Sequence, residues 1–132
     1  MKIQSWHQSD YNQDYTPPAP VLAIQIAGPE AGDWQTVRFA FVDSGADTSI
    51  VPRDLLIRIA AAEWDQAWLR SQWGESRLVY RYEIDLMIAD RVFPSVLVVE
   101  DDMGDEVILG RDFINRLRLL LDGPAGTASL LE

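Results

Sequence analysis

The chain has 132 residues and a mass of 14.9 kDa, which suffices for one compact domain with a single core. Hydrophobic residues make up 48% and charged residues 24%, a balance that excludes the composition of disordered proteins. The 21 acidic and 11 basic side chains give a net charge of -10, which argues against nucleic acid or an anionic membrane as a partner. Because the chain has no cysteine, disulfides and thiolate sites are excluded.

The first residues lack the apolar stretch of a secretory signal. No later run approaches the roughly 20 apolar residues of a membrane span. We therefore expect a soluble, cytoplasmic protein.

Residues 1–20 are polar and end in TPPAP, whose prolines exclude a helix, so we expect an extended N-terminal arm. A single domain is expected over residues 21–132. Val21 to Ile26 and Thr36 to Val42 have the apolar patterns of strands, and the turn residues of GPEAGDW separate them. These two strands predict a hairpin.

The segment RDLLIRIAAAEWDQAWL lacks turn residues and predicts a helix over at least Arg53 to Ala62. Trp64 and Trp68 would lie one helical turn apart, so Trp64 is expected in the core. Alternatively, Trp64, Trp68 and Trp73 could line a peptide groove. Leu78 to Ile88 alternates with period two and predicts a long strand, and IADRVF turns the chain back into a strand over Phe93 to Val99.

Short elements are expected at the end of the chain. They are strands at Val107 to Leu109, Leu119 to Leu121 and Thr127 to Leu131, and a helix at Arg111 to Leu117. The apolar tail ASLLE could pair with the same tail of a second copy, or it could fray. The whole pattern is mainly β with one or two short helices, which favours a small closed, barrel-like sheet.

The stretch AFVDSGADTSIVP ends an apolar strand with an acid, Asp43. Its carboxylate would emerge beside the core, where pKa values shift readily. Ser44 offers a hydroxyl, Gly45 permits close approach of another backbone, and Ala46 keeps the floor of a pocket small. A plain turn uses the same residue types, so the triplet alone leaves both interpretations open.

A second segment, VILGRDFI, follows late in the chain. Together, FVDSGADTSIVP and VILGRDFI resemble the catalytic loop and the late Gly-Arg segment of the retropepsin-like, or retroviral-type, aspartic proteases. The resemblance runs from Val21 to about Leu121. It implies the retropepsin-like acid protease fold, with a flap hairpin between the two motifs and Trp73 and Gly74 at the flap.

The resemblance also implies an aspartic endopeptidase that acts on a peptide or protein substrate and needs no metal or organic cofactor. This chemistry uses two carboxylates around one water, so we expect a homodimer with two Asp43 side chains across a twofold axis. By resemblance, Asp47 and Arg111 support the substrate and the loop, and Gly110 lets a helix begin close behind Asp43. Asp47 and Arg111 could instead be solvated surface charges.

Three features depart from the family pattern. Ser44 stands where Thr is commoner, only Gly74 marks a possible flap tip, and the residues before it look more helical than in small viral members. A non-catalytic dimerisation or peptide-binding module on the same fold therefore stays open as an alternative. A domain released from a larger chain is a further possibility.

Two other features invite simpler interpretations. His7 is the only histidine, which argues against a Ser-His-Asp triad or a histidine-rich metal site, and we expect it to be exposed in the arm. The acidic run EDDMGDE lacks the spacing of a calcium-binding loop, so we expect a solvated loop.

Overall fold

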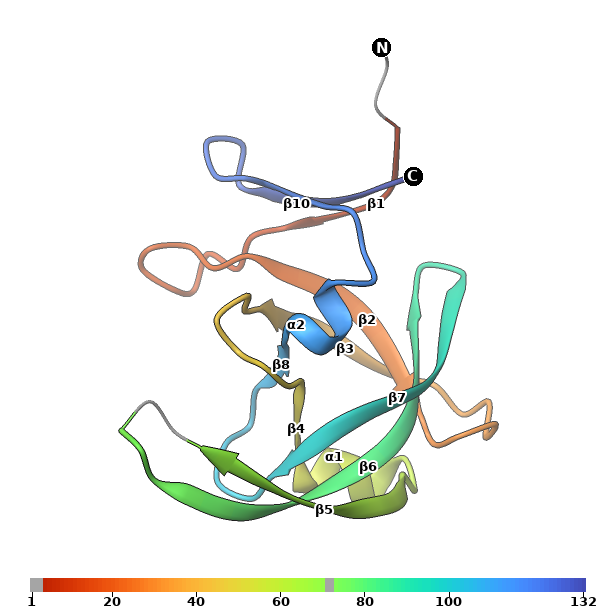
Figure 1. Cartoon of the computed structure of the whole chain (residues 1–132). Coiled ribbons are helices and arrows are strands. Elements are labelled where there is room, and N and C mark those ends of the chain that lie inside the picture. The colour runs from red at the N-terminus through yellow and green to blue at the C-terminus, as the bar shows by residue number, and fades with distance from the viewer. Residues whose placement is uncertain (1–3, 71–72) are drawn as a thin grey trace.

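The computed structural model describes residues 4–70 and 73–132, and the centre of this part is a closed barrel of six strands (Figure 1). Around the barrel the order is β2 (Val21–Ala27), β3 (Gln35–Val42), β8 (Val107–Leu109), β4 (Ile50–Pro52), β7 (Arg91–Asp101) and β6 (Ser76–Ile88). Pairing of β2 with β6, with Ile26 opposite Leu86, closes the ring. The predicted mainly β, barrel-like fold is confirmed.

Aliphatic side chains that alternate along the strands fill the barrel. In β2 and the second half of β6 they are Leu22, Ile24, Ile26, Ile84, Leu86 and Ile88. In the first half of β6 the buried residue is Val79, whereas Leu78 and Tyr80 are exposed. There β6 has left the barrel and pairs, among the described strands, only with β5 (Ala62–Arg70), so no core lies beneath Leu78 and Tyr80.

The helix after β4 is shorter than the sequence predicts. α1 (Arg53–Arg58) ends before Ala62, where the chain enters β5 and pairs with β6 along its whole length. This pairing overrides the local helical propensity, so the prediction of a helix through Ala62 is wrong. Trp64 and Trp68 lie on β5 with exposed fractions of 57% and 71%, so the prediction of Trp64 in the core is also wrong.

A second sheet joins the two ends of the described chain. Its strand order is β1 (Ser5–Asp10), β10 (Thr127–Leu131) and β9 (Leu119–Asp122). β10 is therefore the central strand, with His7 opposite Leu130 on one side and Leu120 opposite Ser129 on the other. The tail ASLLE consequently does not fray, and both its edges are occupied by strands of the same chain.

β1 packs part of the predicted N-terminal arm against the rest of the protein. The indole N–H of Trp6 donates to the Leu131 carbonyl at 3.3 Å, and the Arg91 guanidinium lies 4.1 Å from the centre of the Trp6 ring. His7 is half-buried rather than exposed as predicted. Its Nε2 lies 2.9 Å from the Ser9 hydroxyl, and desolvation lowers its pKa.

The second helix, α2 (Arg111–Ile114), follows β8 directly and ends earlier than the predicted Leu117. Phe113 is fully buried, and its ring meets that of Phe93 edge-on at 5.2 Å. This contact anchors α2 to the barrel. Within the described residues, neither α1 nor α2 has the length and apolar character needed to cross a membrane.

Candidate active site

The loop after β3 holds Asp43 at one end of the barrel. The Asp43 N–H donates to the Leu109 carbonyl of the parallel strand β8 at 3.0 Å. The Gly45 N–H donates to Oδ1 of Asp43 at 2.9 Å, and the Ala46 N–H donates to the Asp43 carbonyl at 3.2 Å. The side chains of Asp43 and Ser44 are exposed, so one chain orients the Asp43 carboxylate but does not bury it.

This loop rests on the start of α2. The Arg111 N–H donates to the Ala46 carbonyl at 2.9 Å. A Cβ on Gly110 would lie 2.5 Å from the Thr48 carbonyl oxygen and 3.0 Å from that of Ala46. The backbone of Gly110 is extended, so the requirement for glycine comes from close approach rather than from an unusual φ. Gly110 thus lets α2 begin directly behind the Asp43 loop.

Ser49 and Asp112, which the sequence analysis did not single out, lock the loop to α2. Ser49 is 1% exposed. Its hydroxyl donates to Oδ1 of Asp112 at 2.8 Å and accepts from the Gly110 N–H at 3.0 Å, and its own N–H donates to Oδ2 of Asp112 at 3.1 Å. Hydrogen bonds on both sides of a buried hydroxyl hold a loop in one conformation.

Asp47 and Arg111 form an ion pair between the loop and α2. Their side chains are 76% and 51% exposed. An ion pair so exposed adds little to the stability of the fold. Its effect is therefore on position: it links the second acid of the loop to the helix behind it.

A hairpin formed by β5 and β6 contains the predicted flap residues. Trp73 and Gly74 lie at its end, Trp73 is 82% exposed, and Gly74 has a φ of 83°, which favours glycine. Residues 71–72 of the predicted flap segment lie outside the described residues. Arg81 donates to both carboxylate oxygens of Asp65 across the stem, at 2.6 and 2.5 Å. In Figure 1 the hairpin end and the loop after β3 both project to the left of the barrel.

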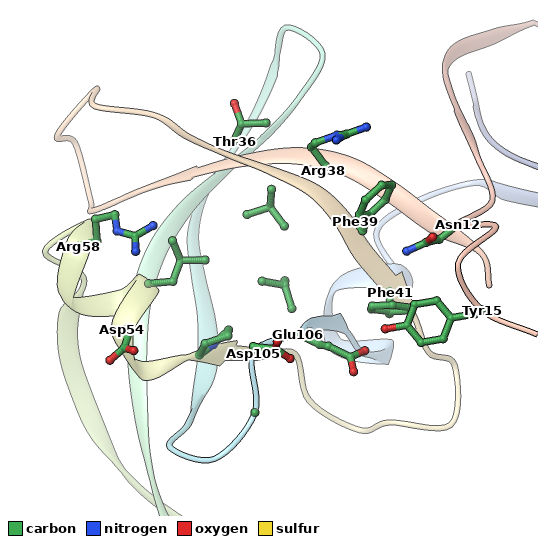
Figure 2. Close-up of a pocket in the computed structure, with 15 residues that line it drawn as sticks. Asn12, Tyr15, Thr36, Arg38, Phe39, Phe41, Asp54, Arg58, Asp105 and Glu106 are labelled. Carbon is green, nitrogen blue, oxygen red and sulfur yellow. The ribbon is translucent and has the colours of Figure 1, made fainter. Parts of the chain in front are cut away.

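A pocket of about 250 Å³ opens beside Asp43. Its lining residues are Ala19, Pro20, Phe41, Val42, Asp43, Glu106 and Ile108. A larger pocket of about 520 Å³ shares Phe41 and Glu106 and extends along β3 to α1, as Figure 2 shows, but it does not include Asp43. We place the candidate site in the smaller pocket because Asp43, the predicted catalytic residue, lines it.

The described residues do not suggest a metal site. Within residues 4–70 and 73–132, no group of three or more His, Asp or Glu side chains is placed to hold a metal ion. Two members of the acidic run EDDMGDE instead pair with arginines: Glu100 with Arg53 at 2.7 Å, and Asp102 with Arg77 at 3.2 Å.

Comparison with known proteins identifies the family. A family model described as retroviral aspartyl protease matches residues 16–122. The chain belongs to the retroviral aspartyl protease family. The resemblance seen in the sequence is thereby confirmed. A search of curated proteins finds no match.

Two solved structures of retroviral-type proteases show the same fold. The structure of EIAV protease with the inhibitor HBY-793 is 18% identical and has a TM-score of 0.60, over 86% of this chain and 100% of that chain. A retropepsin-like aspartic protease from Rickettsia conorii is 12% identical and has a TM-score of 0.64, over 99% of this chain and 94% of that chain. At these identities the likeness concerns the retropepsin-like fold.

Proposed function

We propose that the chain is an aspartic endopeptidase whose active site forms between two copies. Hydrolysis needs an ionised carboxylate to take a proton from water and a protonated one to donate to the scissile carbonyl. The sequence has a single D-S-G-A loop, so each chain supplies one Asp43. Two Asp43 carboxylates that face each other across a twofold axis meet the requirement.

The observation that carries the proposal is the fixed position of Asp43. The Gly45 N–H holds one carboxylate oxygen, and α2 supports the loop from behind through Ala46. A carboxylate oriented in advance loses little freedom when water and substrate arrive. Two such groups in contact share one proton, because like charges disfavour a second ionisation. Activity should therefore fall both when the pair gains a second proton and when it loses the last.

β9 offers a surface for the second copy. It is an edge strand of its sheet, and Leu120 and Leu121 on it are 47% and 45% exposed. Apolar edge strands readily pair with other strands. We place the twofold axis beside β9, so that the sheets of two copies join through antiparallel β9 strands. We propose that this axis also brings the two Asp43 loops toward each other.

The proposed substrate is an extended peptide that adds as a strand beneath the β5–β6 hairpin. Asp47, held by Arg111, would contact the peptide backbone. Ser44 and Gly45 would join the two Asp43 loops across the axis. The reaction requires no metal or organic cofactor, since the two carboxylates supply both the base and the acid.

The test is the variant Asp43→Asn. It should lower cleavage of an unfolded protein substrate by at least about a thousandfold, since both acid–base carboxylates of the site are lost, one from each copy. Sedimentation should still show dimers, and the melting temperature should change little. The control, Asp90→Asn, removes an exposed carboxylate from the turn between β6 and β7 and should cleave normally.

Two outcomes would reject the proposal. Undiminished cleavage by Asp43→Asn would remove Asp43 from the mechanism. Binding of extended peptides by the wild-type dimer at several pH values, without any turnover, would instead favour a peptide-binding module.

A further inference from the structure

The pocket beside Asp43 combines apolar walls with acidic groups. Phe41, Val42 and Ile108 provide the apolar surface, and Asp43 and Glu106 provide two carboxylates. None of the seven lining residues is Lys, Arg or His. A ligand that fills this pocket therefore contacts both apolar side chains and negatively charged carboxylates.

Glu106 lies beside Tyr15, a residue of the N-terminal segment. The ring of Tyr15 packs edge-on against Phe41 with ring centres 5.0 Å apart. Desolvation raises the pKa of Tyr15, and the charge of Glu106 and a hydrogen bond between the two side chains raise it further. Figure 2 shows Tyr15, Phe41 and Glu106 gathered at one end of the larger pocket. Glu106 thus lies in a cluster with Tyr15 and Phe41.

The arginines near this pocket lie outside it. Arg111 pairs with Asp47, Arg38 lies 5.0 Å from the centre of the Phe39 ring, and Arg38 and Arg58 line the larger pocket. None of the three lines the pocket beside Asp43. A bound molecule with a positive charge would therefore complement Glu106 in this pocket.

We propose that this pocket selects substrates with lysine or arginine next to the scissile bond, and that Glu106 is the residue that determines this specificity. The proposal rests on the proposed function, because Asp43 defines which bond is cut. The aliphatic part of the side chain would lie against Phe41 and Ile108, and its charged end would reach Glu106. A bound peptide also excludes water from the pocket, which strengthens the attraction between the charges. In a symmetric dimer the preference applies on both sides of the bond.

The experiment compares peptides that differ only at the residues flanking the scissile bond. These residues are lysine, arginine, norleucine or glutamate. The wild type should cleave the lysine and arginine peptides with kcat/KM about tenfold to a hundredfold above norleucine, and glutamate should be poorest. Equal cleavage of the lysine and norleucine peptides would overturn the proposal.

Two variants assign the preference to Glu106. Glu106→Gln should bring kcat/KM for the lysine peptide down to that for the norleucine peptide, and Glu106→Lys should favour the glutamate peptide. The control is Asp105→Asn, because Asp105 is the adjacent acid but lines only the larger of the two pockets. A lysine preference that survives in Glu106→Gln would also overturn the proposal.

A binding measurement separates this proposal from the proposed function. Peptides with a reduced, uncleavable bond at the centre are titrated into the wild-type dimer, with lysine or norleucine beside that bond. Tighter binding of the lysine peptide without cleavage of any substrate would reject the endopeptidase and keep the cation-binding pocket. Cleavage without discrimination in binding or rate would keep the endopeptidase and reject the cation-binding pocket. Absence of both binding and cleavage would reject both.

Discussion

Gly110 and Thr48 approach so closely that position 110 admits no side chain, since a Cβ there would lie 2.5 Å from the Thr48 carbonyl oxygen. The obstacle is backbone, so it cannot rotate away as a flexible side chain would. Gly110→Ala should therefore lower the free energy of unfolding by about 1–3 kcal/mol, measured by urea denaturation. Cleavage should fall as well, because the Asp43 loop must shift. Gly123→Ala is the matched control, with no atom within 4 Å of the added Cβ, and equal stability of the two variants would contradict the prediction.

The Asp47–Arg111 ion pair should matter for activity more than for stability. Arg111→Met keeps the aliphatic part of the side chain but removes the charge that holds Asp47. The free energy of unfolding should change by less than about 1 kcal/mol, because the pair is exposed. Substrate positioning by Asp47 should suffer, with kcat/KM reduced about tenfold. Arg116→Met, an exposed arginine shortly after α2, serves as the comparison. Unchanged kcat/KM in Arg111→Met would leave the pair without a role in catalysis.

The proposed dimer contact at β9 can be disrupted with charge. The double variant Leu120→Lys and Leu121→Lys places like charges on two strands that would pair, and these charges repel each other. Sedimentation equilibrium should show a monomer at concentrations where the wild type is a dimer, and cleavage should be lost in parallel. As a control, Val92→Lys introduces a single lysine at a position that is 49% exposed on β7. A dimer that persists in the double variant would place the contact elsewhere.

The Asp65–Arg81 pair gives the β5–β6 hairpin a dependence on pH. The hydrogen bond from Arg81 lowers the pKa of Asp65 below its ordinary 3.8. A folded-state pKa below the unfolded value means that the pair stabilises the protein above about pH 4 and loses this effect as pH falls through the lower folded-state value. Asp65→Asn should therefore melt at a lower temperature than the wild type at pH 7, and the two curves should converge in strong acid. A constant difference at all pH values would show that the charge of Asp65 is not responsible.

The sequence predicted the barrel because its strands carry strong local patterns. Val21 to Ile26, Thr36 to Val42 and Val107 to Leu109 each lie within or match a strand of the structure, and each is bounded by turn residues. The family was predictable because the two motifs FVDSGADTSIVP and VILGRDFI occur in the order that is typical of it. In the structure the first motif forms the Asp43 loop and the second leads into α2, which contacts that loop from behind.

The errors arose where contacts distant in sequence outweigh local preference. The residues after Arg58 favour a helix by themselves, but β6 supplies a partner for a strand that no local pattern reveals. Ser49 and Asp112 were missed for the same reason, because their hydrogen bonds join positions far apart in the chain. Glu106 looked like one more acid of a solvated loop until its neighbours Phe41 and Tyr15 were known.

The β1–β10 pairing has a consequence for the order of events during synthesis. Trp6 and Leu131, which meet in this sheet, are 125 positions apart in sequence. Closing so long a loop is entropically unfavourable and slow, so the sheet forms after the more local hairpins of the barrel. A nascent chain on the ribosome cannot complete it until β10 has emerged. If β9 needs β10 beside it to accept a second copy, the proposed dimer cannot form before β10 has been synthesised.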